Sequence, residues 1–133
     1  MITEEISLEK IVDSVPGVVF QFEMCKSGIT RFPFVSKGFD NIFEVAADQF
    51  KEDASLALSR IHTEDYQSLM YNMFNCYENG TTFSQTFRIV SSVTNKTIWL
   101  KVSAIPELHD PKCAVWYGYM SDITQEIEVQ TFN

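Results

Sequence analysis

WYGYMSDIT, residues 116–124, ends the last of three consecutive segments in which apolar and polar residues alternate. The two preceding segments are residues 83–90 and 97–105. Such alternation is typical of strands with one face buried. The connections, at 91–96 and 106–111, are short. Because short links join neighbouring strands, the three segments are predicted to pair antiparallel in one sheet.

The segments before residue 83 predict the remainder of an α+β domain. Residues 18–24 alternate, and 30–35 return after a turn, which predicts a hairpin of two more strands. Residues 36–61 carry apolar residues interrupted by charges and predict several short helices. A further helix is predicted over residues 7–14, where Pro16-Gly17 would end it.

A longer helix is predicted to begin at Thr63, which can cap its first backbone N–H groups, and to end at Gly80. Apolar residues recur at helical spacing from Tyr66 to Tyr77, so one face should be buried. The expected fold class is therefore α+β, a five-stranded antiparallel sheet with the short helices and this longer helix over one face, plus the N-terminal helix.

Composition fits one domain and argues against several partners. The 133 residues are 45% hydrophobic and 14% aromatic, enough for one core. The net charge is -8 and the basic residues are scattered, which argues against nucleic acid. Neither a signal-peptide pattern nor an apolar run of about 20 residues is present, so a cytoplasmic domain without membrane insertion is expected.

Three cysteines, Cys25, Cys76 and Cys113, are odd in number and widely spaced, without a Cys-x-x-Cys pair. This pattern predicts three reduced thiols and no metal site. No cluster of a nucleophile, a base and an orienting acid is evident, because His62 with Glu64 and Asp65 is better explained by helix capping. Enzymatic activity is therefore not expected of this domain.

Five short motifs follow one another along the chain: Ile61-His62-Thr63-Glu64-Asp65, Phe87-Arg88-Ile89, Ile98-Trp99-Leu100, Gly118 and Asp122-Ile123-Thr124. In their order and spacing they resemble the motifs of PAS sensor domains of bacterial histidine kinases and diguanylate cyclases, and the resemblance covers residues 11–124. Thr63, Thr86 and the turn at 91–96 depart from the family pattern, which affects surface polar contacts.

The resemblance implies a division of the chain and a role. Residues 1–16 would be a flanking helix, 17–124 the PAS sensor domain, and 125–133 the start of an exit helix or linker to an output domain of a two-component or similar signalling protein. Asp122, Ile123 and Thr124 would form the junction that passes a conformational change to that output domain.

Family membership leaves the ligand open, and the residues argue against two cofactors. Flavin-binding members carry amides on the inner faces of the last three strands, where this chain has Ile89, Leu100 and Met120. Haem needs an axial ligand such as histidine, and neither His62 nor His109 lies on a predicted inward face. Flavin and haem are therefore both unexpected.

The apolar interior has two interpretations, a filled core or a pocket for a small apolar or aromatic ligand. The filled core is favoured, because this many aromatic side chains can fill the interior of a small domain. Gln85, polar on an apolar face, would contact a ligand or bond to neighbouring backbone. The candidate ligand-binding residues share predicted inward positions: Phe22, Phe34, Phe39, Met73, Gln85, Phe87, Ile89, Leu100, Val102, Trp116 and Met120.

A domain that signals in this way is expected to form a dimer. Leu8, Ile11 and Val12 of the N-terminal helix and outward residues of the last strand, Val115, Tyr117 and Tyr119, would form an apolar surface for a homodimer or an intramolecular contact. The function expected is a sensory domain that passes a ligand- or partner-induced change onward. The alternative is a ligand-free module for protein interaction and dimerisation with a filled core.

Overall fold

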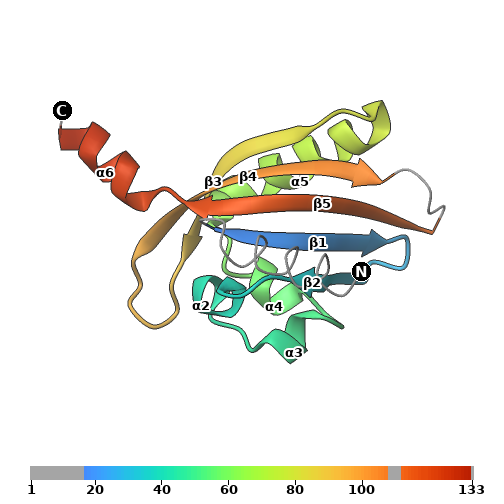
Figure 1. Ribbon diagram of the computed structural model, residues 1–133, viewed down its shortest axis with the longest axis horizontal. Helices are drawn as coiled ribbons and strands as arrows, with labels where there is room; N and C mark the ends of the chain where they lie inside the picture. Colours follow the sequence, from blue (N-terminus) through green and yellow to red (C-terminus); the bar gives the residue numbers. More distant parts are fainter. Residues whose placement is uncertain (1–16, 108–111, 133) are drawn as a thin grey trace, which may run out of the picture.

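Five strands form one antiparallel sheet in the computed structural model, which describes residues 17–107 and 112–132. Their spatial order is β2-β1-β5-β4-β3, so the first and last strands of the chain are central neighbours (Figure 1). The predicted strands are all present, and the α+β fold class is confirmed. The strands are β1 Val18–Cys25, β2 Thr30–Val35, β3 Phe83–Val90, β4 Thr97–Glu107 and β5 Cys113–Asp122.

Helices α2 to α5 pack against one face of this sheet. The three short ones, as predicted, fill the region 36–61: α2 Phe39–Phe43, α3 Ala47–Phe50 and α4 Ser55–Leu58. The longer α5, Thr63–Asn79, packs across β3 and β4. A last helix, α6 Thr124–Phe132, projects beyond the sheet where β5 ends (Figure 1). The helix predicted over 7–14, with its Leu8, Ile11 and Val12, lies outside the described residues.

The two ends of α5 are set by a histidine and a glycine. Gly80 ends the helix with φ 65°, as predicted, since glycine adopts this left-handed conformation without steric cost. The N-cap is His62, whose Nδ1 accepts a hydrogen bond of 3.1 Å from the Glu64 N–H. The prediction of Thr63 as the cap was therefore wrong, because the histidine ring supplies the acceptor one residue earlier. Tyr66, predicted on the buried face, is 42% exposed.

A bulge in β2 reverses the direction of one predicted core residue. Gln21 and Glu23 of β1 pair with Phe34 and Arg31, so two steps along β1 match three along β2. The extra residue moves Phe34 to the outer face, where it is 47% exposed, and turns Val35 toward the core. The inward placement predicted for Phe34 from simple alternation was therefore wrong.

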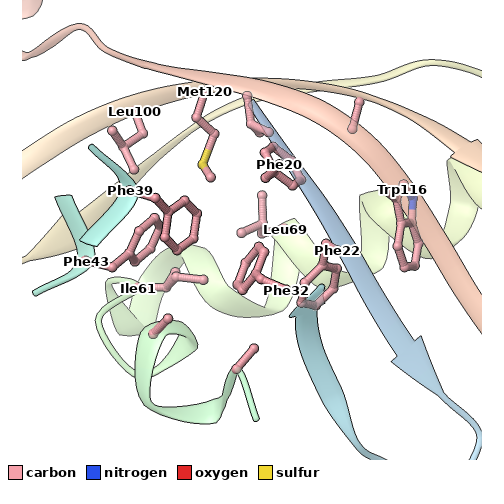
Figure 2. Close-up of a cluster of buried hydrophobic side chains, with 14 of the residues drawn as sticks. Phe20, Phe22, Phe32, Phe39, Phe43, Ile61, Leu69, Leu100, Trp116 and Met120 are labelled. Atoms are coloured by element: carbon pink, nitrogen blue, oxygen red, sulfur yellow. The ribbon is translucent and has the colours of Figure 1, made fainter. Parts of the chain in front are cut away.

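Aromatic rings make up much of the core between the sheet and the short helices. Phe39 stacks on Phe43 at 4.7 Å between ring centroids and lies 4.8 Å from Phe32 and from Phe50 (Figure 2). Offset and edge-on ring contacts of this kind add to the stability gained by burying apolar area. The short helices are thus held by their phenylalanines, since their lengths would not sustain them in isolation.

The cysteine prediction was wrong for two of the three residues. Cys25 and Cys113 form a disulfide, with an S–S distance of 2.02 Å, and Cys76 remains a free thiol. The two bonded residues are 88 positions apart in the chain but directly opposite each other in the β1–β5 register. Long-range strand pairing brings them together, and spacing along the chain does not reveal it.

The outward residues of β5 are not all exposed. Tyr117 is 47% exposed and Tyr119 is half-buried, whereas Val115 is buried. Val115 is thus already covered within the chain, which is one of the two outcomes expected for this surface, and Tyr117 is its exposed part. No helix in the described ranges is long and apolar enough to cross a membrane.

Candidate functional site

A small cavity of about 40 Å³ lies between the sheet and helices α2, α4 and α5. Its side chains come from both layers, and Figure 2 shows Phe20 and Met120 of the sheet on the side that faces Leu69 of α5. Every lining residue is apolar: Phe20, Phe22, Phe32, Phe43, Leu58, Ile61, Leu69, Met70, Met73, Phe83, Phe87, Val102, Ala104 and Met120.

Five of the predicted ligand-binding residues line this cavity: Phe22, Met73, Phe87, Val102 and Met120.

Phe39, Ile89 and Leu100 are fully buried but pack elsewhere in the core, and Phe34 faces outward. Sequence reasoning did not place Phe43, Leu58 or Ile61 at the site. The short helices and the loop that carry them show no regular spacing of apolar residues. The one available signal was the presence of a large apolar residue in a stretch predicted to be helical.

Gln85 is held by helix α5. Its Oε1 accepts a hydrogen bond from Asn72 Nδ2 at 2.7 Å, and its Nε2 donates to Ser68 Oγ at 3.3 Å. Both ends of the amide are therefore engaged by side chains of α5. Gln85 joins β3 to α5, and neither the cavity nor neighbouring backbone takes its hydrogen bonds.

Trp116 lies at the other end of the core. Its ring centroid is 5.8 Å from that of Phe22, 5.9 Å from that of Phe74 and 5.6 Å from that of Tyr77. Figure 2 shows Trp116 apart from Phe20, Leu69 and Met120. Its indole Nε1–H is buried without an acceptor in the part of the chain that the structure describes. An acceptor on a ligand could satisfy a buried donor of this kind.

An ion pair joins the start of α5 to β3. Asp65 Oδ2 accepts hydrogen bonds from Arg88 N at 2.8 Å and Arg88 Nε at 2.9 Å, and Oδ1 accepts from Arg88 Nη2 at 2.7 Å. Glu64 lies 3.3 Å from the same guanidinium. The hydrogen bonds that Arg88 donates to Asp65 hold the pKa of Asp65 below its usual value, and the same bonds raise the pKa of Arg88.

Arg88 also connects this ion pair to the next strand. Its guanidinium carbon lies 5.3 Å from the ring centroid of Trp99 on β4, within the range of a cation–π contact. The backbone of the same Trp99 binds Ile123 and Thr124, where α6 begins. The polar start of α5 and the end of β5 therefore meet at one residue, through its ring and its backbone respectively.

The predicted junction residues are held to the backbone of Trp99. Thr124 Oγ1 accepts a hydrogen bond from Trp99 N at 2.9 Å, and Ile123 N donates to Trp99 O at 2.9 Å. Asp122 Oδ1 accepts from Thr124 N at 2.9 Å and from Thr124 Oγ1 at 2.6 Å. Helix α6 begins at Thr124 itself, so its first residue is fastened to β4.

The residues considered above as contacts for flavin or haem offer few polar groups to a cofactor. Ile89, Leu100 and Met120 are all buried and apolar, so they offer no hydrogen bonds to a flavin ring. His62 Nδ1 caps α5. His109 lies outside the described residues.

Glu23, Cys25 and Cys113 form the one cluster of possible metal ligands in the described ranges, and the disulfide occupies both sulfur atoms there.

No protein-family model matches the chain, and no curated protein has a matching sequence. Solved structures, in contrast, are similar over most of its length. The N-terminal domain of a diguanylate cyclase with a PAS/PAC sensor from Marinobacter aquaeolei has a TM-score of 0.62 at 14% identity, covering 82% of this chain and 98% of that one.

Two further structures agree. A domain assigned to a histidine kinase from Haloarcula marismortui has a TM-score of 0.64 at 16% identity, covering 90% of this chain and 99% of that one. A PAS domain from Colwellia psychrerythraea has a TM-score of 0.62 at 15% identity, covering 94% and 99%. The chain therefore has the PAS fold, as its motifs indicated.

Proposed function

We propose that this chain is a sensory and regulatory PAS domain of a multidomain bacterial signal-transduction protein. In this proposal the domain passes a ligand- or partner-induced conformational change to a C-terminal output module, such as a histidine kinase or a diguanylate cyclase, and itself catalyses no reaction. The supporting observation is the attachment of α6 to Trp99 through both the N–H and the C=O of that residue.

The route from the core to the junction is short. Val102 and Met120 line the cavity from β4 and β5 and face each other in the register of these strands. Trp99 and Asp122 lie a few residues further along the same two strands. A change in the cavity that shifts β4 against β5 therefore alters the hydrogen bonds that position the first turn of α6. A signal requires that the ligand prefer one of the two arrangements.

The volume of the cavity limits the size of any ligand. This volume of about 40 Å³ is far below the roughly 300 Å³ of an ordinary small-molecule pocket. A small apolar molecule fits the present arrangement, and an aromatic one requires side chains to move. Three of the lining residues, Met70, Met73 and Met120, are unbranched and flexible, so they can adapt at low cost.

The small cavity also favours a second candidate function. A ligand-free PAS module with a filled core would act through contacts with a second copy or a partner protein. For both the ligand-binding sensor and the ligand-free module we propose a homodimer and a cytoplasmic location. Nucleic acid is not proposed as a partner in either, because the net charge is -8.

Native mass spectrometry of freshly purified protein, beside its denatured spectrum and an absorbance scan, tests the ligand version. A mass excess that disappears on denaturation supports a retained ligand. Hydrogen exchange of the loaded and emptied protein then tests signalling, since the amides of Trp99, Ile123 and Ile127 should exchange at different rates in the two states. A bare mass favours the ligand-free module, and identical exchange at the junction in both states contradicts transmission through α6.

A further inference from the structure

The Cys25–Cys113 pair lies in a part of the molecule that the proposed function does not use. Cys25 ends β1 and Cys113 begins β5, so the pair is the last step of the β1–β5 ladder. Beyond it, Lys26 N donates to Lys112 O at 3.0 Å. The opposite end of β5 leads to the exit junction (Figure 1). The pair is therefore separate from both the cavity and α6.

The charges around Cys25 favour a reactive sulfur. Arg31 Nη2 lies 3.9 Å from Cys25 Sγ, while Glu23 Oε1 lies 3.4 Å from the same sulfur and 3.3 Å from Arg31 Nε. The guanidinium stabilises a thiolate, and it also balances the carboxylate that would otherwise oppose one. The exposed Lys26 adds positive charge from the β1–β2 turn. A thiolate is the form that attacks a disulfide.

Both cysteines lie at a groove that is open to a small molecule. The two cysteines are only partly buried, and they line a groove of about 260 Å³ together with the end of α5. Buried structural disulfides lack such access. The other groove residues are Met24, Lys26, Phe74, Tyr77, Glu78, Lys112 and Ala114.

A metal site is the competing use of the same atoms, since Glu23, Cys25 and Cys113 are close enough to share an ion. Arg31 opposes it, because the guanidinium already interacts with the Glu23 carboxylate and places positive charge beside the sulfur that would bind the cation. Thiol chemistry therefore fits this cluster better than metal binding.

We propose that Cys25 and Cys113 form a redox-active pair that exchanges reversibly with a small thiol and its disulfide. The Cys25 thiolate attacks one sulfur of the small disulfide, which forms a mixed disulfide and releases one small thiol. The Cys113 thiolate then attacks Cys25 Sγ and releases the second. Two cysteines are oxidised, one small disulfide is reduced to two thiols, and the two cysteine protons end on those thiols. This activity does not depend on a ligand in the cavity.

Glutathione buffers provide the test, in a Cys76→Ser background that leaves only the two thiols of interest. The folded protein is equilibrated at ratios of reduced to oxidised glutathione that run from strongly reducing to strongly oxidising. It is then quenched with acid and alkylated, and its mass is measured by mass spectrometry. We expect two alkyl groups at the reducing end and none at the oxidising end, with the same midpoint approached from either direction. A pair that stays oxidised in every buffer is a structural disulfide and overturns the proposal, as does a pair that never oxidises.

The role of Arg31 is tested separately in a Cys113→Ser, Cys76→Ser protein, where Cys25 is the one thiol. Arg31→Gln should slow its alkylation at neutral pH and move the midpoint of the rate against pH upward. Lys101→Gln removes an exposed charge on β4 and is the matched control. An unchanged pH profile in Arg31→Gln, in protein shown to be folded by circular dichroism, would overturn Cys25 as the attacking thiol.

Discussion

Asp65 shows how one carboxylate can hold two elements together. It accepts hydrogen bonds from the backbone and the side chain of Arg88, so the ionised form is favoured in the folded protein and its pKa is lowered. A lowered folded-state pKa contributes stability above the unfolded value of about 3.9. That contribution is lost as the pH falls through the folded value.

Asp65→Asn should therefore lower the free energy of unfolding at neutral pH by about 2 kcal/mol, the range for hydrogen bonds to a charged group. The same substitution should make the free energy of unfolding fall less as the pH is lowered from 5, because the variant lacks the carboxyl group that would be protonated. Urea unfolding at several pH values measures both effects. Asp48→Asn, at an exposed acid, is the control and should leave the neutral-pH value unchanged.

The hydroxyl of Thr124 links the start of α6 to β4 and to Asp122. Thr124→Val keeps the shape but removes the acceptor for Trp99 N and the donor to Asp122. We expect faster amide exchange at Trp99 and in the first turn of α6, with a loss of stability of about 1 kcal/mol for the missing hydrogen bond. Thr86→Val, at an exposed residue of β3, is the matched control. Equal exchange in both variants would show that Thr124 does not fasten α6.

Among the elements, β5 depends on the lack of a side chain at Gly118. A Cβ there would lie 2.6 Å from Ser103 O, 2.7 Å from Ala104 Cβ and 2.7 Å from Phe20 Cζ. The carbonyl oxygen belongs to the neighbouring strand and cannot move alone. The glycine therefore permits close approach of β1, β5 and β4 at the centre of the sheet.

Gly118→Ala should destabilise the protein by about 2 kcal/mol, as overpacking in a well-packed region usually does. Thermal or urea unfolding measures it, with Ser103→Ala at an exposed position of β4 as the control. An unchanged midpoint would mean that the strands separate to admit a methyl group without cost. The resemblance pointed to Gly118 as a motif residue, but its neighbours became known only from the strand register.

At the scale of the whole molecule, the disulfide closes most of the chain into one loop. Its cysteines are 88 residues apart, and cross-linking so long a loop stabilises the folded state by about 4.6 kcal/mol in the loop-closure account, because the unfolded chain loses entropy. Reduction should therefore lower the unfolding midpoint of a Cys76→Ser protein. A Cys25→Ser, Cys113→Ser variant should not respond to reductant, and an equal response in both would contradict a role of this bond in stability.

The succession of strands along the chain, the short helices, the long helix and the motifs typical of PAS domains could all be predicted from the amino-acid sequence. Alternating and helical periods are local patterns, so they could be read without coordinates. The motifs also drew attention to Asp122, Ile123 and Thr124, which make hydrogen bonds where β5 ends and α6 begins.

The features that depend on strand register became known from the folded structure. It turned Phe34 outward through a bulge, engaged Gln85 with α5 rather than with the cavity, and brought Cys25 opposite Cys113. Each of these results from contacts between separate elements, and a shift of one residue in register reverses which face a side chain takes. Local periodicity indicates which residues share a face, but it does not locate a bulge or name the partner across the strands, because these are set by the packing of the whole sheet against its helices.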